Sequence, residues 1–362
     1  MNDTPRLPLG LMNQVAFAQL DALRVALDRA WSTYDNRTDR CPCQAVETDS
    51  PARLLRYRAV SASGPVVLLV PAPIKTADIW DMEPTSSVVR RHVSDGCRVY
   101  MLLWPRRVGA TKELGLSDYA HTMLRAAMDA VRSDTGVERV FVTGHSLGGT
   151  MATLFAARNP EYVAGLTLLA APLHFRPDIG ALGRLVALNA DTDPLTDGAT
   201  HVPGSLLNTL TATASPDTFV LARAWDWLES LTDPGALRGH LLVERWTLRE
   251  TPLPTRLFRE LVDELYRADA FCRGQLQLAG RAVSPADVIA PAACVVDPRC
   301  DVVPPEAVLP ALERFATEDR EVLRYSGDIG VSLQHVGLLV GRNAHRQLWP
   351  QLLAWIRARH RD

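Results

Sequence analysis

A serine stands in the segment FVTGHSLGGTMATLFAA, residues 141–157, where Gly144, Ser146 and Gly148 form the pattern G-x-S-x-G. An apolar run precedes this pattern, and a helix-like segment follows it. A nucleophilic serine on a sharp strand-to-helix turn needs small neighbours, because its strained backbone leaves no room for side chains beside it. The pattern alone recurs by chance, but its place between a buried strand and a helix makes Ser146 a candidate nucleophile for acyl transfer.

A serine hydroxyl is a poor nucleophile until a base takes its proton, and we expect that base to be a histidine oriented by a carboxylate. In folds with such a turn the chain order is serine, acid, histidine. His335, in SLQHVGLLVG, follows the last strand-like run and precedes the last helix-like run, so it is the candidate base. Among the other histidines after Ser146, His174 stands too early, and His201 and His240 lie in a helical insertion. His345 lies inside the last helix-like run, and His360 stands at the end of the chain. We expect His345 to be a surface residue.

Two carboxylates lie between the serine and the histidine in VVDPRCDVVPPEAV, where the chain leaves a strand-like run. Asp297 stands near the strand end, where it can structure a turn. Asp301 stands in the loop, before Val-Val-Pro-Pro. The residues alone leave both open as the acid, and Asp301 is favoured partly on the resemblance described below.

An oxyanion hole needs two backbone N–H groups. The first should belong to Leu147, the residue after the nucleophile. The second should come from the loop PAPIKT, which follows the strand predicted at 66–70. Pro71 and Pro73 have no N–H to donate, so Ile74 is the candidate, with Lys75 behind it.

Short apolar runs alternate with helix-like segments from about residue 53. The predicted strands are 53–59, 66–70, 97–104, 137–143, 165–171, 292–297 and 320–325. The predicted helices among and after them are 86–94, 117–134, 147–158, 305–316 and 344–360. Apolar strands without polar alternation, separated by helices, indicate an α/β fold with a mostly parallel sheet and helices on both faces.

Four parts follow from this pattern. Residues 1–50 hold an amphipathic helix, at 12–34, and a polar linker, and residues 51–175 form the first part of the core. Residues 176–288 interrupt the alternation with a largely helical insertion, and residues 289–362 complete the core. The insertion leaves the carboxyl edge of the sheet, where α/β folds bind ligands, so it is predicted to be a cap, with extra core packing as the alternative.

The composition excludes several classes of function. The 362 residues carry a net charge of −2, which gives no electrostatic basis for binding nucleic acid or an anionic membrane. The apolar run from Pro65 to Pro73 is too short to span a bilayer, and the first residues lack the pattern of a secretory signal, so a cytoplasmic protein is expected. Six cysteines show no zinc-ligand spacing and are predicted to be free thiols: Cys41, Cys43, Cys97, Cys272, Cys294 and Cys300.

Several segments resemble the polyhydroxyalkanoate synthases, especially their shorter type. The similar segments are LLVPAPIKTADIWDMEPTSSVVRRHVSDGCRVYMLLW, DYAHTMLRAAMDAVRSDTG, ERWTLRETPLPTRLFRELVDELYRADAFCRGQLQLAGR, DVVPPEAVLP and HVGLLVGRNAHRQLWP. The resemblance implies an α/β-hydrolase core with a cap. It places the family acid, which begins a D-x-x-x-P stretch, on Asp301, and the family histidine on His335. Two positions depart from the family: Ser146 replaces its nucleophilic cysteine, and Cys300 stands where that family is often acidic.

The serine changes the expected chemistry. An acyl-serine is an oxoester, so its transfer to another alcohol is nearly neutral in free energy, and water competes with the alcohol in large excess. The expected function is therefore acyl hydrolysis or a single acyl transfer through an acyl-serine. The resemblance implies a 3-hydroxyacyl or similar group carried on coenzyme A or a carrier protein, and no metal or redox cofactor. A serine-dependent polymer synthase and a silent homologue that binds polymer granules or a synthase partner are the alternatives. A homodimer formed through the cap is plausible.

Overall fold

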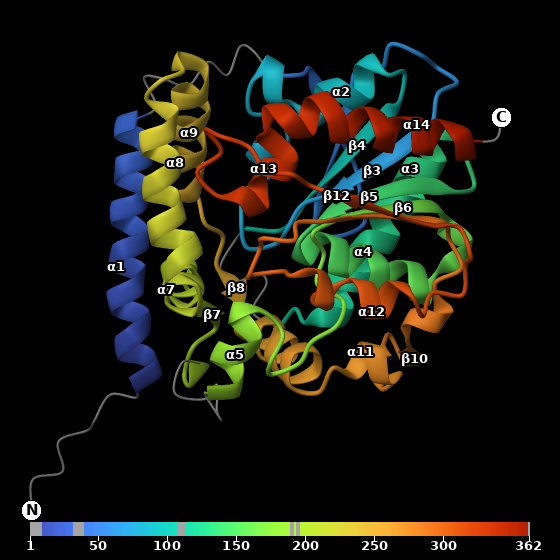
Figure 1. Cartoon of the computed structure of the whole chain (residues 1–362). Coiled ribbons are helices and arrows are strands. Elements are labelled where there is room, and N and C mark those ends of the chain that lie inside the picture. The colour runs from blue at the N-terminus through green and yellow to red at the C-terminus, as the bar shows by residue number, and fades with distance from the viewer. Residues whose placement is uncertain (1–8, 32–39, 107–112, 189–191, 193–195, 361–362) are drawn as a thin grey trace, which may run out of the picture.

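The computed structural model describes residues 9–31, 40–106, 113–188, 192 and 196–360, with the side chains of residues 9–14 left aside. Its centre is an eight-stranded sheet in the order β1-β2-β4-β3-β5-β6-β11-β12 (Figure 1). The strands are β1 (Cys43–Val46), β2 (Arg53–Tyr57), β3 (Val66–Val70), β4 (Arg98–Leu103), β5 (Val140–His145), β6 (Val163–Leu169), β11 (Ala292–Val296) and β12 (Arg320–Arg324).

The sheet is mostly parallel, as the sequence predicts. Neighbouring strands from β4 to β12 pair in parallel, whereas β1 and β2 form an antiparallel edge. All residues of β3 and β5 are buried, which explains the apolar runs VVLLV in β3 and VFV at the start of β5. Strand β5 begins three residues later than predicted and continues through Gly144 and His145, which pair with Leu168 and Leu169 of β6. The strand therefore ends one residue before Ser146.

Helices cover both faces of the sheet (Figure 1). Helices α2 (Val88–Ser94) and α14 (Trp349–Arg359) contact one another on one face, and α3 (Met123–Thr135) contacts α4 (Leu147–Arg158) on the other. The helix predicted at 305–316 is shorter: a 3-10 turn, Pro305–Ala307, is followed by α12 (Leu309–Leu312). Prolines at 304, 305 and 310 lack the N–H groups that a longer helix needs here.

The chain between β6 and β11 forms the insertion predicted as a cap. Its helices are α5 (Gly180–Leu188), α7 (Gly204–Ala214), α8 (Ala222–Ser230), α9 (Pro234–Thr247) and α10 (Thr255–Glu260), with a ribbon of β7 (His201–Val202) and β8 (Leu253–Pro254). The last part, α11 (Ala270–Arg273) with β9 (Leu276–Leu278) and β10 (Arg281–Val283), brings β10 against α4 of the core. The insertion therefore contributes to core packing as well as to a cap.

The N-terminal segment is more structured than a helix with a linker. Helix α1 (Leu9–Ala30) contacts α7 of the cap along the outer edge of the molecule (Figure 1). Its Asp28 accepts hydrogen bonds from Arg245 and Arg249, which fixes α1 to the end of α9. Strand β1 lies inside the stretch predicted as linker. Its side chains are largely exposed on both faces, so the sequence shows no alternation that would reveal it.

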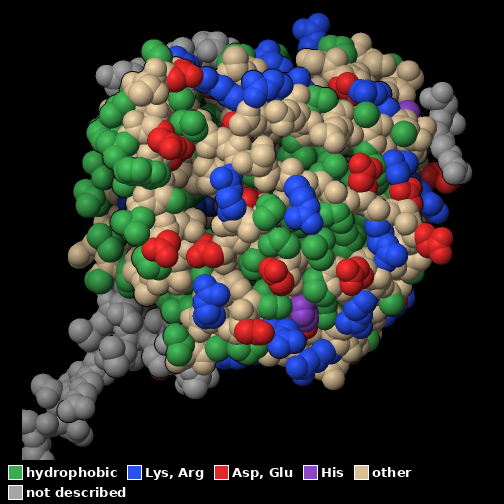
Figure 2. Space-filling model, viewed as in Figure 1, with side chains coloured by type: hydrophobic (Ala, Val, Ile, Leu, Met, Phe, Trp, Pro, Cys, Tyr) green, Lys and Arg blue, Asp and Glu red, His purple; other side chains and the backbone are tan. Residues whose placement is uncertain are grey.

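Apolar side chains remain exposed over the cap side of the molecule. Figure 2 shows them gathered over α1 and the neighbouring cap helices. Trp225 and Trp227 of α8 are 66% and 44% exposed, and Leu23 of α1 is 55% exposed. Among the described residues, no helix has the length and apolar character needed to cross a membrane.

Candidate active site

Ser146 occupies a strained turn between β5 and α4. Its φ of 52° and ψ of −133° lie outside the regions that residues with a Cβ prefer, at a cost of roughly 1–3 kcal/mol. The turn is held on both sides of the residue: Ser146 N–H donates to the carbonyl of Leu169 at 3.0 Å, and its own carbonyl accepts from Gly149 and Thr150. This is the backbone geometry that a nucleophilic elbow requires.

The two glycines of the pattern are needed for close packing. A Cβ on Gly144 would lie 2.5 Å from Cα of Gly149, and a Cβ on Gly148 would lie 2.2 Å from the carbonyl oxygen of Val70. Both contacts are with backbone atoms, which cannot move aside as a flexible side chain could. The glycines therefore allow α4 to begin directly against β3 and β5.

One cavity brings most of the predicted site residues together. It encloses about 130 Å³, and Ser146, His335, Leu147 and Ile74 all line it. Its other walls are largely apolar and come from both core and cap, with Trp80, Leu207, Phe219, Tyr266 and Trp246 among them. Asp301 does not line this cavity, although the next two residues do. The structure thus places the predicted nucleophile, base and oxyanion-loop residues at one site below the cap.

His335 is the second residue of α13 (Gln334–Val340) and is fixed by His145, the residue before the serine. His145 Nε2 lies 2.9 Å from the backbone carbonyl of His335, and the two rings are 4.7 Å apart between centroids. Burial lowers the pKa of His145 to about 4, so this ring is neutral at pH 7 and its Nε2–H donates to the carbonyl. Burial and His145 also hold the pKa of His335 well below its usual range. His335 is therefore neutral at pH 7, as a general base must be.

The contacts of Asp301 differ from those predicted for a triad acid. Its carboxylate accepts hydrogen bonds from Ser215 Oγ at 2.5 Å and Thr218 Oγ1 at 2.6 Å, both in the cap. Within the described residues no hydrogen bond links this carboxylate to His335. Instead, Cys300 Sγ lies 3.7 Å from His335 Nδ1. The loop orients neighbouring residues differently, so that Cys300 faces the histidine and Asp301 faces the cap.

Asp297, the other candidate acid, is completely buried at the end of β11. Its Oδ1 accepts a hydrogen bond from Arg299 N–H at 2.9 Å, which confirms the predicted role in the turn. Its Oδ2 has no hydrogen-bond partner, and burial raises the pKa of this carboxyl group. Asp297 thus shapes the loop that carries both Cys300 and Asp301.

Comparison with known proteins agrees with this fold and resemblance. A family model described as "alpha/beta hydrolase fold" matches residues 65–209. The chain is 26% identical over 343 residues to a poly(3-hydroxyalkanoate) polymerase subunit PhaC from Haloferax mediterranei. The aligned region covers 94% of this chain and 68% of that protein. It is 24% identical to the PhaC subunit of Allochromatium vinosum over 88% of this chain and 89% of that protein. The chain therefore has an α/β-hydrolase fold and is similar to these polymerase subunits over most of its length.

Solved structures show the same fold for this polymerase-like α/β-hydrolase. An esterase from Rhodococcus sp. matches with a TM-score of 0.54 and 15% identity, over 88% of this chain and 99% of that one. A monoacylglycerol lipase from Paleococcus ferrophilus matches with a TM-score of 0.53 and 17% identity, over 85% of this chain and 99% of that one. These two structures show the fold; the family match and the similarity to polymerase subunits indicate an enzyme of the hydrolase superfamily.

A buried ion pair closes the side of the cavity that is formed by the loop after β3. Lys75 Nζ lies 2.7 Å from Glu250 Oε1 and 5.3 Å from the ring centre of Trp246. Burial lowers the pKa of Lys75 and raises that of Glu250, which is the usual effect of desolvation on each charged form. The loop is also joined to the cap by its backbone, since Thr251 N–H donates to the carbonyl of Ile74 at 3.1 Å. Lys75, placed behind Ile74 on sequence grounds, thus anchors the loop to the cap.

A cap network that the sequence did not reveal supports the histidine loop. Asp226 of α8 accepts hydrogen bonds from the backbone N–H groups of Gly330 and Ser332, each at 2.8 Å. His240 of α9 places Nδ1 2.7 Å from the same carboxylate. These contacts hold the loop that leads into α13 and His335, although 104 residues separate Asp226 from Gly330. His240 therefore supports the site without lining the cavity.

The prediction for His345 was wrong. This residue is 3% exposed, and its Nε2 lies 2.8 Å from the carbonyl of Leu339. It belongs to a π-helical turn, Ala344–Leu348, which directs the ring towards Trp349 rather than towards solvent. Burial lowers the pKa of His345 to about 4. It is a core residue away from the cavity.

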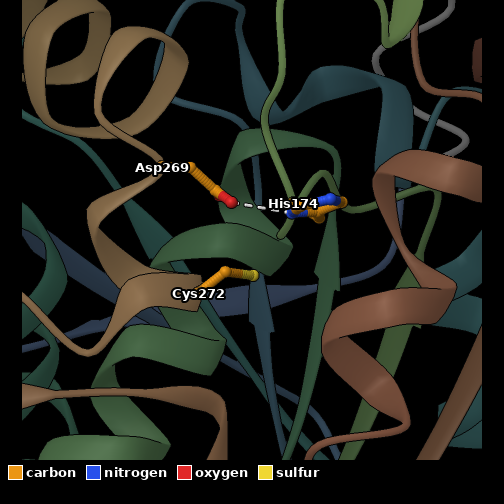
Figure 3. Close-up of side chains that lie close together, drawn as sticks. All are labelled: His174, Asp269 and Cys272. Carbon is orange, nitrogen blue, oxygen red and sulfur yellow. Dashed lines mark ion pairs between the residues drawn. The ribbon is translucent and has the colours of Figure 1, made fainter.

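A second cluster contains the residue types that can bind metal ions. In Figure 3 His174, from the loop after β6, faces Asp269 and Cys272 of the insertion. His174 Nδ1 lies 2.8 Å from Asp269 Oδ2, and Asp269 Oδ1 accepts from Phe175 N–H. Cys272 Sγ lies 3.2 Å from the carbonyl of Leu173. These contacts join the insertion to the core without requiring an ion.

Proposed function

We propose that this enzyme is a serine-dependent acyl hydrolase or single-transfer acyltransferase that accepts a short acyl group from a thioester or ester. Ser146 Oγ attacks the acyl carbonyl while His335 takes its proton. The N–H groups of Leu147 and Ile74 stabilise the oxyanion of the tetrahedral intermediate. The protonated histidine then gives its proton to the leaving thiol or alcohol, and an acyl-serine remains.

The second half of the reaction repeats these roles with another nucleophile. Water or an alcohol attacks the acyl-serine, His335 takes its proton, and Ser146 recovers the proton as the ester bond breaks. Loading from a thioester is downhill, whereas transfer from the acyl-serine to an alcohol is nearly neutral in free energy. Hydrolysis, or one transfer in a site that excludes water, therefore suits Ser146 better than repeated chain extension.

The size of the cavity supports a short acyl group. An apolar cavity of about 150 Å³ is known to hold a benzene molecule, which has about six non-hydrogen atoms. The cavity beside Ser146 encloses about 130 Å³. A 3-hydroxybutyryl group, with a similar number of atoms, is therefore close to the largest acyl group that this conformation accepts.

Ser146 and His335 enter this proposal with the roles predicted from the sequence. Asp301, predicted as the acid, acts here as a tether, because its carboxylate accepts hydrogen bonds from Ser215 and Thr218 of the cap. A homodimer stays a prediction. The exposed side chains of Trp225 and Trp227 are available to such an interface, and sedimentation equilibrium of the wild-type chain tests it.

The observation that carries the proposal is the strained conformation of Ser146 in a cavity shared with His335. The test is incubation with 3-hydroxybutyryl-coenzyme A, with release of coenzyme A followed in time and the acyl product identified by mass. Ser146→Ala is the matched control, since it removes one oxygen and leaves the turn in place. Free 3-hydroxybutyrate from the wild type alone supports the hydrolase. Equal release from both proteins contradicts the mechanism.

A serine-dependent polymer synthase is the second candidate. The similarity to polymerase subunits over 88% to 94% of the chain favours it. The same incubation separates the two, because a synthase yields oligomeric esters whose masses rise by one hydroxyacyl unit at a time. Absence of release by the wild type, with coenzyme A and carrier-protein thioesters alike, would instead support the silent homologue.

A further inference from the structure

We propose that Cys300 takes the place of the triad acid and orients His335 through its thiol. This inference rests on the proposed function, in which His335 is the base. It concerns a positioning residue, because Cys300 acts on the acyl group only through the histidine.

The thiol is held in a fixed position beside the imidazole. Cys300 is 6% exposed, and its Sγ lies 3.7 Å from His335 Nδ1. Val303 N–H donates to the same sulfur at 3.4 Å, while Cys300 N–H donates to the carbonyl of Asp297 at 3.1 Å. Sulfur hydrogen bonds are longer than those of oxygen or nitrogen, so the contact with Nδ1 is of the length expected for a weak N–H to sulfur bond. The turn that begins at Asp297 thus directs Sγ towards the histidine.

The two nearby carboxylates have other contacts. Both oxygens of Asp301 accept hydrogen bonds from cap hydroxyl groups. Asp297 uses one oxygen for the backbone of Arg299, and its second oxygen is buried without a partner. Cys300 is therefore the residue whose side chain meets Nδ1 in the described structure.

A thiol and a carboxylate affect the imidazole differently. Burial raises the pKa of Cys300 to about 11, so the group is neutral at pH 7. Its sulfur accepts a hydrogen bond from Val303 N–H and can accept a second from Nδ1–H. That second bond leaves Nε2 free to take the proton of Ser146. The thiol therefore selects the productive tautomer but supplies no negative charge to stabilise the imidazolium, which a carboxylate would do.

The other charged groups near His335 do not supply the negative charge that a triad carboxylate would provide. His145 packs against its ring and is neutral at pH 7. Across the cavity Lys75 is paired with Glu250, and Arg223 with Glu244. Asp297 and Asp301 raise the pKa of Cys300, and their own hydrogen bonds go to the Arg299 backbone and to cap hydroxyl groups. The protonation of His335 should therefore respond strongly to a charge introduced at position 300.

The test measures His335 directly by NMR, without requiring turnover. The ring ¹H and ¹⁵N shifts of His335, assigned with His335→Gln, are followed against pH in the wild type, Cys300→Asp, Cys300→Ala and Asp301→Asn. A carboxylate within a few ångströms should raise the pKa of His335 by roughly 1–2 units in Cys300→Asp. Asp301→Asn, the matched control one residue away, should leave it within about 0.3 units. Cys300→Ala should turn a predominantly Nδ1-protonated ring into a mixture of tautomers.

Kinetics give the second measurement. In Cys300→Asp the acid limb of kcat/KM should move to higher pH by the same roughly 1–2 units. Cys300→Ser, which keeps a neutral acceptor, should hold the limb near its wild-type position. Asp301→Asn should alter KM, through the cap, more than the pH profile.

Three results would overturn the inference. They are a larger change of the His335 pKa in Asp301→Asn than in Cys300→Asp, an unchanged pKa in a folded Cys300→Asp, and an unchanged tautomer in Cys300→Ala. If Cys300→Asp does not fold, the tautomer of Cys300→Ala decides the question. Failure of the proposed function is seen separately, as wild-type turnover that is absent or unaffected by Ser146→Ala.

Discussion

Replacing Asp226 by alanine should both destabilise the enzyme and slow its reaction. The Asp226 carboxylate is 5% exposed and accepts from Gly330 N–H, Ser332 N–H and the ring of His240. Removing it leaves two backbone donors and a buried imidazole without their acceptor. Breaking one side of a buried, hydrogen-bonded pair typically costs about 3–5 kcal/mol.

That cost can be measured as a shift in thermal unfolding. For a chain of this size each kcal/mol corresponds to roughly 1–2 °C, so Tm should fall by roughly 3–10 °C. Because the loop that leads into α13 and His335 loses its support, kcat should also fall by about tenfold or more, with a smaller change in KM. Differential scanning calorimetry and steady-state hydrolysis of the same thioester give the two numbers.

Arg238→Ala, in helix α9 of the cap, is the matched control. Arg238 pairs with Glu83 at 3.0 Å but is 53% exposed, and such a pair contributes about 0–1 kcal/mol. Its Tm should change by less than about 2 °C. Asp226→Ala with the Tm and kcat of the control would refute the view that the cap holds the histidine loop.

Further predictions concern the base, the elbow, the cavity wall and pH. His335→Ala should lower kcat by several orders of magnitude with little loss of stability. His345→Ala should instead lower Tm, because the buried ring of His345 contacts the Leu339 carbonyl, and it should leave kcat nearly unchanged. Equal losses of kcat in the two variants would mean that the base is misassigned. Gly148→Ala should fail to fold or lose activity, since its Cβ would meet the Val70 carbonyl at 2.2 Å, and a soluble variant of full activity would contradict the elbow geometry. Burial lowers the pKa values of His92, His145 and His345 to about 4, whereas in the unfolded chain these rings have pKa values near 6.5, so the unfolded chain binds more protons between these two pH values. The free energy of unfolding should therefore fall as pH is lowered from about 6.5 to about 4. A urea midpoint that does not change across that range would argue against it.

The fold was predictable because its determinants are local. The apolar runs of β3 and β5 are long enough and buried enough to mark a parallel sheet, and the elbow pattern lies within five consecutive residues. His335 followed from chain order, since it stands between the last strand and the last helices. Strand β1 escaped detection because its exposed side chains have no periodicity.

The partner of His335 was not predictable because it depends on the direction of a single side chain. Cys300 and Asp301 are neighbours in a loop that follows β11, and Cys300, whose Sγ also accepts from Val303 N–H, is the one that faces the histidine. The sequence pattern assigns the acid to Asp301, one residue after Cys300, and it does not show which of these two side chains faces His335. Asp226 was missed for a different reason: its contacts with the histidine loop join distant parts of the chain and leave no trace in residue spacing.

In the proposed mechanism Ser146 carries the acyl group. The most direct test mixes the wild-type enzyme with 3-hydroxybutyryl-coenzyme A, quenches the reaction in acid during the first turnover, and measures the intact mass and the peptide masses. We expect one added hydroxybutyryl group on the peptide that contains Ser146, and no adduct in Ser146→Ala. An adduct on a cysteine such as Cys300, or an equal adduct in Ser146→Ala, would contradict it.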